Sequence, residues 1–190
     1  TALIVYDKAE FEKILPLYLS VYDRFKDNPA YQHDLVDITR QVLANASYEY
    51  YRAFEDAWMA KDYSAFNQLS GKFLRLIKLQ DKVLSTRPEF MLGTWINSAR
   101  TMLDGMDDWT RDQFEFNARA MVTTWGTEQA ADAGLRDYSN RQWQGLTGDF
   151  YYQRWATWIQ ALKSAAATGQ KQDAIKVNWF PLEYRWVNQN

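Results

Sequence analysis

Aromatic side chains, glycines and arginines gather in one stretch of the 190-residue chain, residues 123–158. This stretch holds four of the nine tryptophans, four of the eight glycines, three tyrosines and three arginines. Flat rings offer rigid contact area, and glycine lets a ligand or another chain approach closely. Over the whole chain, 16% of the residues are aromatic. The composition favours an aromatic core, and the alternative is a surface that binds sugar or docks a protein.

Paired carboxylates are the second group that could do chemistry. Hydrolysis of a glycosidic bond needs two carboxyl groups about 5 to 9 Å apart across a pocket. The chain has 24 acidic residues, and those nearest to ring-rich positions are Asp37, Glu55, Glu115, Asp137 and Asp149. Because no spacing pairs any two of them, the favoured interpretation is helix caps and solvated charges. The sequence assigns no catalytic residue.

Metal and nucleophilic chemistry lack their residues. The chain has no cysteine and one histidine, His33, which has polar neighbours and is expected to be a solvated surface residue. A helical di-iron site needs paired Glu-x-x-His motifs, and an activated serine needs an adjacent base. Since neither is present and no glycine-rich phosphate loop occurs, we expect no metal site and no cofactor.

Charge and hydropathy exclude two kinds of partner. A formal net charge of −2 gives no electrostatic reason to bind nucleic acid. No apolar run approaches the roughly 18 residues needed to span a bilayer, so no membrane insertion is expected. Thr1 is not followed by a charged and then apolar leader, so no targeting segment is visible.

One arginine lies in an apolar stripe. On a helix, Arg154 would share a face with Trp143, Leu146 and Phe150. A buried cation without a partner is very costly, so Arg154 must meet a carboxylate. It either holds an internal carboxylate for the fold or orients a site residue, and we expect a structural role for Arg154 and for its neighbour Trp155.

The elements that must position these residues are helices. Apolar side chains recur with a 3.6-residue period along the chain. Asp7 is a candidate cap for a first helix, which Pro16 should kink or divide. One long helix is expected over residues 30–61, and Asp62 then caps a helix that ends near Ser85.

The second half continues the pattern. Pro88 is expected at the first position of a helix that Gly105 ends. The next helix opens at Asp107 or Asp108, and Gly126 is expected as the left-handed residue at its C-terminus.

The ring-rich stretch predicts its own long helix. This helix is expected from Arg136 or Asp137 to Thr168, with Gly145 and Gly148 either bending it or marking tight helix–helix contact. Pro181 divides the remaining segment and favours a short last helix. With no convincing strand, the sequence predicts an all-α fold, a bundle of about six to eight antiparallel helices in a single domain over residues 1–190.

Six segments in order carry a family resemblance. They are residues 31–41, 90–100, 117–119, 123–126, 137–146 and 151–155. Single motifs such as Leu-Gly-x-Trp are weak, but their ordered combination is specific. The chain resembles the C-terminal all-α domain of the α-N-acetylglucosaminidases, glycoside hydrolase family 89, which includes the lysosomal enzyme that trims heparan sulfate and its bacterial relatives.

The resemblance implies a larger hydrolase. A small N-terminal domain and a catalytic (β/α)8 barrel would precede this domain, and the two catalytic glutamates of a retaining mechanism would belong to the barrel. The resemblance therefore implies the barrel of the same polypeptide and a glycan with terminal N-acetylglucosamine as partners. It also implies a secreted, periplasmic or lysosomal location.

The resemblance also implies binding residues. Trp125 of the Thr-Trp-Gly motif matches the position that walls the substrate pocket, and a ring at a helix end can present a flat face to a sugar. Tyr138, Arg141 and Trp143 are further expected substrate contacts. The alternative for Trp125 is packing inside the bundle.

Two other functions stay open from the residues alone. The chain could be a free-standing helical domain that binds carbohydrate or protein, or a complete small enzyme. The missing carboxylate pair and base argue against the small enzyme. The upstream coding sequence would separate the three, because only the hydrolase requires a barrel there.

Overall fold

The computed structural model describes residues 5–134 and 136–189. Of the residues in these ranges 73% are helical, and none lies in a strand. An isolated parallel bridge pairs Met91 with Gln144. The predicted all-α fold is confirmed, whereas the antiparallel arrangement of the whole bundle stays a prediction.

Contacts between residues divide the chain into two compact units, Thr1–Arg87 and Pro88–Asn190. The expectation of a single domain over residues 1–190 stays a prediction.

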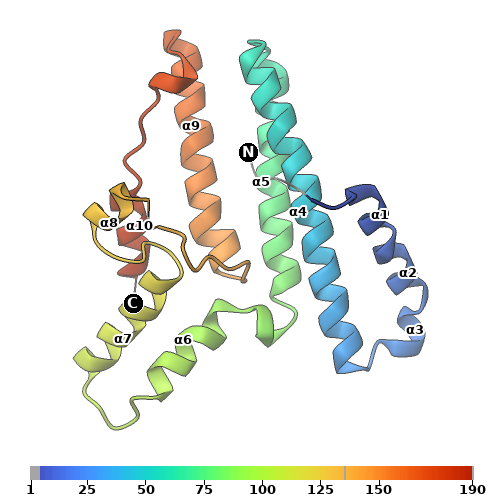
Figure 1. Cartoon of the computed structure of the whole chain (residues 1–190), viewed down its shortest axis with the longest axis vertical. Helices are drawn as coiled ribbons and strands as arrows, with labels where there is room; N and C mark the ends of the chain where they lie inside the picture. Colours follow the sequence, from blue (N-terminus) through green and yellow to red (C-terminus); the bar gives the residue numbers. More distant parts are fainter. Residues whose placement is uncertain (1–4, 135, 190) are drawn as a thin grey trace. The chain divides into compact units, whose positions relative to one another are not determined.

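The first unit is a long helical hairpin with a short helical segment along it (Figure 1). Its helices are α1 (Lys8–Glu12), α2 (Ile14–Ser20), α3 (Tyr22–Phe25), α4 (Pro29–Met59) and α5 (Tyr63–Leu84). Asn28 and Asp62 begin the two long helices, because their side-chain oxygens accept backbone N–H groups of the first turn. The expected long helix and the helix capped by Asp62 are both confirmed.

Packing in the first unit is aromatic. Phe54 is 1% exposed and meets Phe66 and Phe73 edge to face, with ring centroids 5.9 and 5.4 Å away. The break between α1 and α2 lies at Lys13. Pro16 explains this break, because its ring would clash with the carbonyl four residues earlier, that of Glu12.

The second unit contains shorter elements, drawn from green to red in Figure 1. They are η1 (Pro88–Phe90), α6 (Leu92–Thr101), α7 (Asp108–Met121), α8 (Glu128–Asp132), η2 (Leu146–Tyr151), α9 (Tyr152–Thr168), η3 (Gln172–Ala174) and α10 (Phe180–Val187). Asp107 caps α7 by accepting the N–H of Thr110. Pro88 begins a separate 3-10 turn, and α6 runs only from Leu92 to Thr101, so the predicted helix from Pro88 to Gly105 is wrong at both ends. Pro181 lies in the first turn of α10, the short last helix that the sequence predicts.

One buried cluster joins α6, α7, η2 and α10. Its members are Leu92, Ile96, Ala118, Val122, Leu146, Phe150, Trp186 and Val187. Phe150 and Trp186 lie in ring contact, with centroids 5.2 Å apart. The cluster fixes the helices that carry the loops between residues 122 and 145.

The predicted helix from Arg136 or Asp137 to Thr168 is wrong in its first half. Asp137 has a φ of 61° and Gly145 a φ of 86°, and such left-handed residues interrupt a right-handed helix. Helical structure begins only at Leu146, as the π-helical turn η2 that continues into α9. Gly145 therefore starts this helical segment and does not bend it.

The predicted left-handed position at Gly126 is also wrong by one residue. Trp125 itself takes it, with a φ of 62°. The reason is that α7 ends at Met121 and that Val122, Thr123 and Thr124 are then buried, at 3%, 1% and 1% exposed. Because these residues stay packed in the core, the chain reverses direction only at Trp125.

Candidate functional site

Among the aromatic residues of the ring-rich stretch, two are exposed. The ring centroids of Trp125 and Tyr138 lie 5.2 Å apart, with their planes inclined by 49°. Trp125 is 40% exposed and Tyr138 is 74% exposed. The two rings therefore pack on each other and still present apolar surface to the outside. Trp125 is therefore not buried inside the bundle, which was the alternative.

A tight turn at the end of α7 holds Trp125. Its backbone N–H donates to the carbonyl oxygen of Ala120 at 2.7 Å, a bond that closes the helix end. The Thr123 hydroxyl donates to the carbonyl oxygen of Arg119, also at 2.7 Å. Because Thr123 is 1% exposed, its hydroxyl needs such a partner inside the protein.

A second turn holds Tyr138. The residue before it, Asp137, is left-handed, and its backbone N–H donates to the carbonyl oxygen of Thr123 at 2.8 Å. The N–H of Asn140 then donates to the carbonyl oxygen of Asp137 at 3.2 Å. The two turns lie on either side of α8 in the sequence, and the bond from Asp137 to Thr123 joins them.

The Asp137 carboxylate is anchored to α9 and the turn before it. The Tyr151 hydroxyl donates to Asp137 Oδ1 at 2.9 Å, and the Arg154 guanidinium donates to Asp137 Oδ2. Burial, followed by the Asp137 carboxylate, raises the pKa of Tyr151, so this hydroxyl remains a proton donor. The expected pairing of Arg154 with an internal carboxylate is confirmed.

A second carboxylate supports Arg154 from α10. Glu183 Oε1 lies 3.2 Å from Arg154 Nε, and the Glu183 side chain is 1% exposed. Burial raises the pKa of Glu183, although Arg154 and Arg136 lower it in part. The Arg154 guanidinium also lies 5.6 Å from the ring centroid of Trp179. Arg154 is thus held by two carboxylates and an indole.

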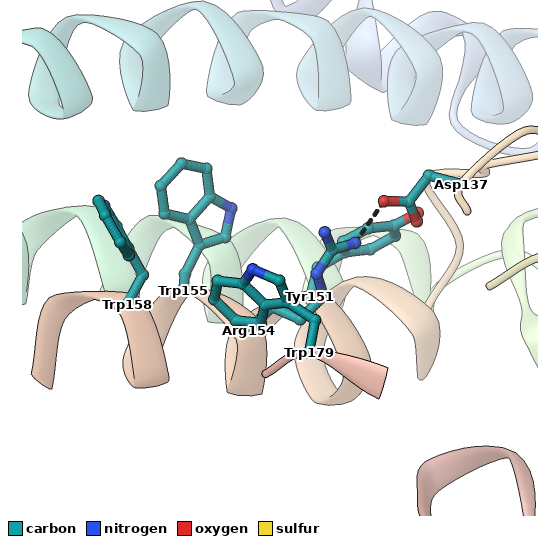
Figure 2. A pocket seen from close by; sticks show the side chains of 6 residues that line it. All are labelled: Asp137, Tyr151, Arg154, Trp155, Trp158 and Trp179. Atoms are coloured by element: carbon teal, nitrogen blue, oxygen red, sulfur yellow. Dashed lines mark hydrogen bonds and ion pairs between the residues drawn. The ribbon is translucent and has the colours of Figure 1, made fainter. Parts of the chain in front are cut away.

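A cavity of about 480 Å³ opens beside this network. Its lining residues are Asp137, Tyr151, Arg154, Trp155, Trp158 and Trp179. Figure 2 shows the indoles of Trp155 and Trp158 projecting from α9, with the ion pair between Arg154 and Asp137 at the other end of the cavity. The wall is aromatic and the polar groups at its end are paired with each other.

The other expected site residues have different surroundings. Arg141 is exposed, and its guanidinium donates to the carbonyl oxygens of Ser139 and Asn140. Trp143 is partly buried against the core cluster, with its ring centroid 6.1 Å from that of Trp95. The structure therefore brings Trp125 together with Tyr138, and Arg154 together with Trp155. The substrate contacts of Trp125, Tyr138, Arg141 and Trp143 stay predictions. So do the structural roles of Arg154 and Trp155.

The carboxylates near the rings have structural partners. In chain order, the partners of the five carboxylates are Arg40 for Asp37, Tyr51 for Glu55, Arg100 and Arg119 for Glu115, Arg154 and Tyr151 for Asp137, and Gln153 and Trp186 for Asp149. Over the described ranges, no group of three or more acidic or histidine side chains is arranged to hold a metal ion. In the same part of the chain, no helix has the length and apolar character to cross a bilayer.

Sequence reasoning missed Glu183 and Tyr151. Glu183, Trp186 and Val187 recur at the spacing of one helix face, and all three are buried. That spacing could have placed Glu183 in the core and so suggested it as the partner of Arg154. Nothing in the sequence points to the bond from Tyr151 to Asp137, because it depends on the left-handed turn.

Comparison with known proteins decides the family. The alpha-N-acetylglucosaminidase (NAGLU) C-terminal domain matches over residues 1–190. The chain belongs to this family. The alpha-N-acetylglucosaminidase of Homo sapiens is a relative, 29% identical over 187 residues, which are 97% of this chain and 24% of that protein.

Solved structures of this family agree with the fold. A family 89 glycoside hydrolase from Clostridium perfringens, in complex with 2-acetamido-1,2-dideoxynojirmycin, is 54% identical with a TM-score of 0.92. The match covers 99% of this chain and 21% of that one. A Clostridium perfringens structure with the same identity and TM-score is in complex with its substrate, GlcNAc-alpha-1,4-galactose. The α-N-acetylglucosaminidase C-terminal domain described here thus spans about a quarter or less of these relatives.

Proposed function

We propose that this domain works within a full-length α-N-acetylglucosaminidase that hydrolyses terminal α-linked N-acetylglucosamine. The observation that carries the proposal is the exposed pair of Trp125 and Tyr138, held by two left-handed turns in a chain that matches a glycosidase domain along its length. The substrate complex of the Clostridium perfringens relative supports the choice of sugar.

Within that enzyme, the domain completes the substrate pocket. An indole face packs well on the C–H groups of a sugar ring, and an adjacent phenol adds apolar area with a polar tip. Trp125 borders the N-acetylglucosamine, and Tyr138, Arg141 and Trp143 are further candidates for substrate contact. The groups that transfer protons and attack the sugar belong to the barrel, since the described acidic residues near the rings have structural partners.

The domain also buttresses the catalytic barrel of the same polypeptide. The enzyme acts in a secreted, periplasmic or lysosomal compartment, as its relatives suggest, and heparan sulfate is one candidate substrate there. The 190-residue chain alone is expected to release no nitrophenol from nitrophenyl α-N-acetylglucosaminide, because it holds the wall of a pocket and not its catalytic pair.

A structure of the full-length protein with an N-acetylglucosamine analogue tests the pocket role. The expected result is carbon–carbon contact at about 4 Å between the Trp125 ring and the sugar. If the Trp125 ring lies more than a sugar's width from the analogue, or is covered by the barrel, Trp125 does not belong to the pocket.

A further inference from the structure

Trp125 and Asp137 share an unusual backbone conformation. Of the described residues other than glycine, these two and Lys61 have a positive φ. For an L-residue with a bulky side chain, that conformation costs about 1 to 2 kcal/mol and persists where surrounding contacts enforce it. Gly126 could take the strain at no steric cost, yet Trp125 carries it. The turn therefore fixes the position of the indole, although a turn with Gly126 in the left-handed conformation would be less strained.

The contacts that enforce the two turns form one connected path. It runs from Glu183 on α10, through Arg154 on α9, to the Asp137 carboxylate. From Asp137 the backbone bond of 2.8 Å continues to Thr123, two residues before Trp125. Every side chain on this path is at most 26% exposed, so solvent screens its charges little.

We propose that Asp137, Arg154 and Glu183 are positioning residues for the Trp125–Tyr138 pair. Arg154 is fixed on one side by Glu183 and by the Trp179 ring, and on the other side it holds the Asp137 carboxylate. Asp137 in turn has the left-handed backbone that orients Tyr138, and its N–H bonds to Thr123 in the turn that carries Trp125. This inference rests on the proposed function, because it assigns the network an effect on substrate through the two rings.

The geometry predicts an effect on catalysis that is separable from stability. Asp137→Asn keeps the size of the side chain, and asparagine tolerates the left-handed conformation, so the turn can form. It weakens the link to Arg154 by removing the charge. Tyr151→Phe is milder, because it keeps the ring and removes one hydrogen bond to Asp137.

The experiment uses the full-length enzyme and nitrophenyl α-N-acetylglucosaminide. Each variant is measured alone and combined with Trp125→Ala, in a double-mutant cycle. We expect Asp137→Asn to lower kcat/KM by about threefold to thirtyfold, and to add less than about twofold when Trp125 is already alanine. Tyr151→Phe should show the same pattern with a smaller loss in kcat/KM. If Asp137→Asn does not fold, the double-mutant cycle with Tyr151→Phe tests the positioning role.

The matched control breaks another ion pair in the same unit. Arg100 donates to Glu115, whose side chain is 5% exposed. Arg100→Gln should lower stability and leave kcat/KM within about twofold. Equal losses from Asp137→Asn in both Trp125 backgrounds, or a kinetic loss from Arg100→Gln as large as that from Asp137→Asn, would overturn the positioning role. Normal kinetics for Trp125→Ala alone would instead overturn the proposed function.

Discussion

The backbone N–H of Asp137 donates a hydrogen bond of 2.8 Å to the carbonyl oxygen of Thr123. This bond joins the turn that carries Trp125 to the turn that carries Tyr138, across the short helix α8. The rings of the two residues then meet at 5.2 Å. Because the backbone bond and the ring contact restrain the same two turns, the aromatic pair should behave as one unit.

Loss of Arg154 should destabilise the second unit. Arg154→Ala leaves the carboxylates of Asp137 and Glu183 without their cation, and removing one partner of a buried ion pair costs about 2 to 4 kcal/mol. The check is the melting temperature of the full-length variant. A melting temperature within one degree of the wild type would show that the network does not hold the fold.

Glu183 should make stability depend on pH. Burial raises its pKa in the folded protein, with Arg154 and Arg136 opposing the shift in part. The folded state therefore binds this proton more tightly than the unfolded state, so the contribution is complete below the unfolded pKa. This contribution of Glu183 to the free energy of unfolding is lost as the pH rises through the folded pKa.

Glu183→Gln removes that titration, because glutamine keeps the shape and carries no charge. The free energy of unfolding of the variant, relative to wild type, should rise as pH increases from about 4 to 8. Unfolding curves at several pH values on both proteins provide the measurement. A difference that is constant with pH would contradict a shifted pKa for Glu183, and one that falls would mean that Arg154 and Arg136 outweigh burial.

The backbone strain at Trp125 predicts an order between two variants. Glycine adopts a positive φ without steric cost, whereas alanine does not. Trp125→Gly should therefore be more stable than Trp125→Ala by about 1 kcal/mol, the reverse of the usual order at helix positions. Denaturant unfolding of the two variants measures the difference. An alanine variant that is the more stable of the two would mean that the turn relaxes when the ring is removed.

The sequence predicts the regular parts of this fold well. The long helix over residues 30–61 and the cap at Asp62 follow from apolar period and cap chemistry, which are local signals. The start of α9 could not be found this way. Residues 136–144 mix helix formers such as Arg141 with turn formers such as Asn140, so local propensity does not decide between helix and turn. The tertiary bond from Asp137 to Thr123 and the ion pair with Arg154 hold a left-handed turn there instead.

The candidate site divides in the same manner. The pairing of Arg154 is predictable, because an arginine in an apolar stripe requires a carboxylate. The identity of that carboxylate is not, since Asp137 and Glu183 reach Arg154 from different elements of the fold. The place of Trp125 at the end of a helix is visible in the sequence, but its left-handed backbone follows from the burial of Thr123 and Thr124.

The most direct test of the account is Trp125→Ala in the full-length enzyme, with kinetics and stability measured on the same preparation. We predict a loss in kcat/KM of about tenfold to a thousandfold, or roughly 1.4 to 4 kcal/mol of transition-state stabilisation. Stability should fall by less than the roughly 3 to 5 kcal/mol of a core Trp→Ala substitution, because the ring is 40% exposed. A variant that melts much earlier yet keeps normal kinetics while folded would contradict the account.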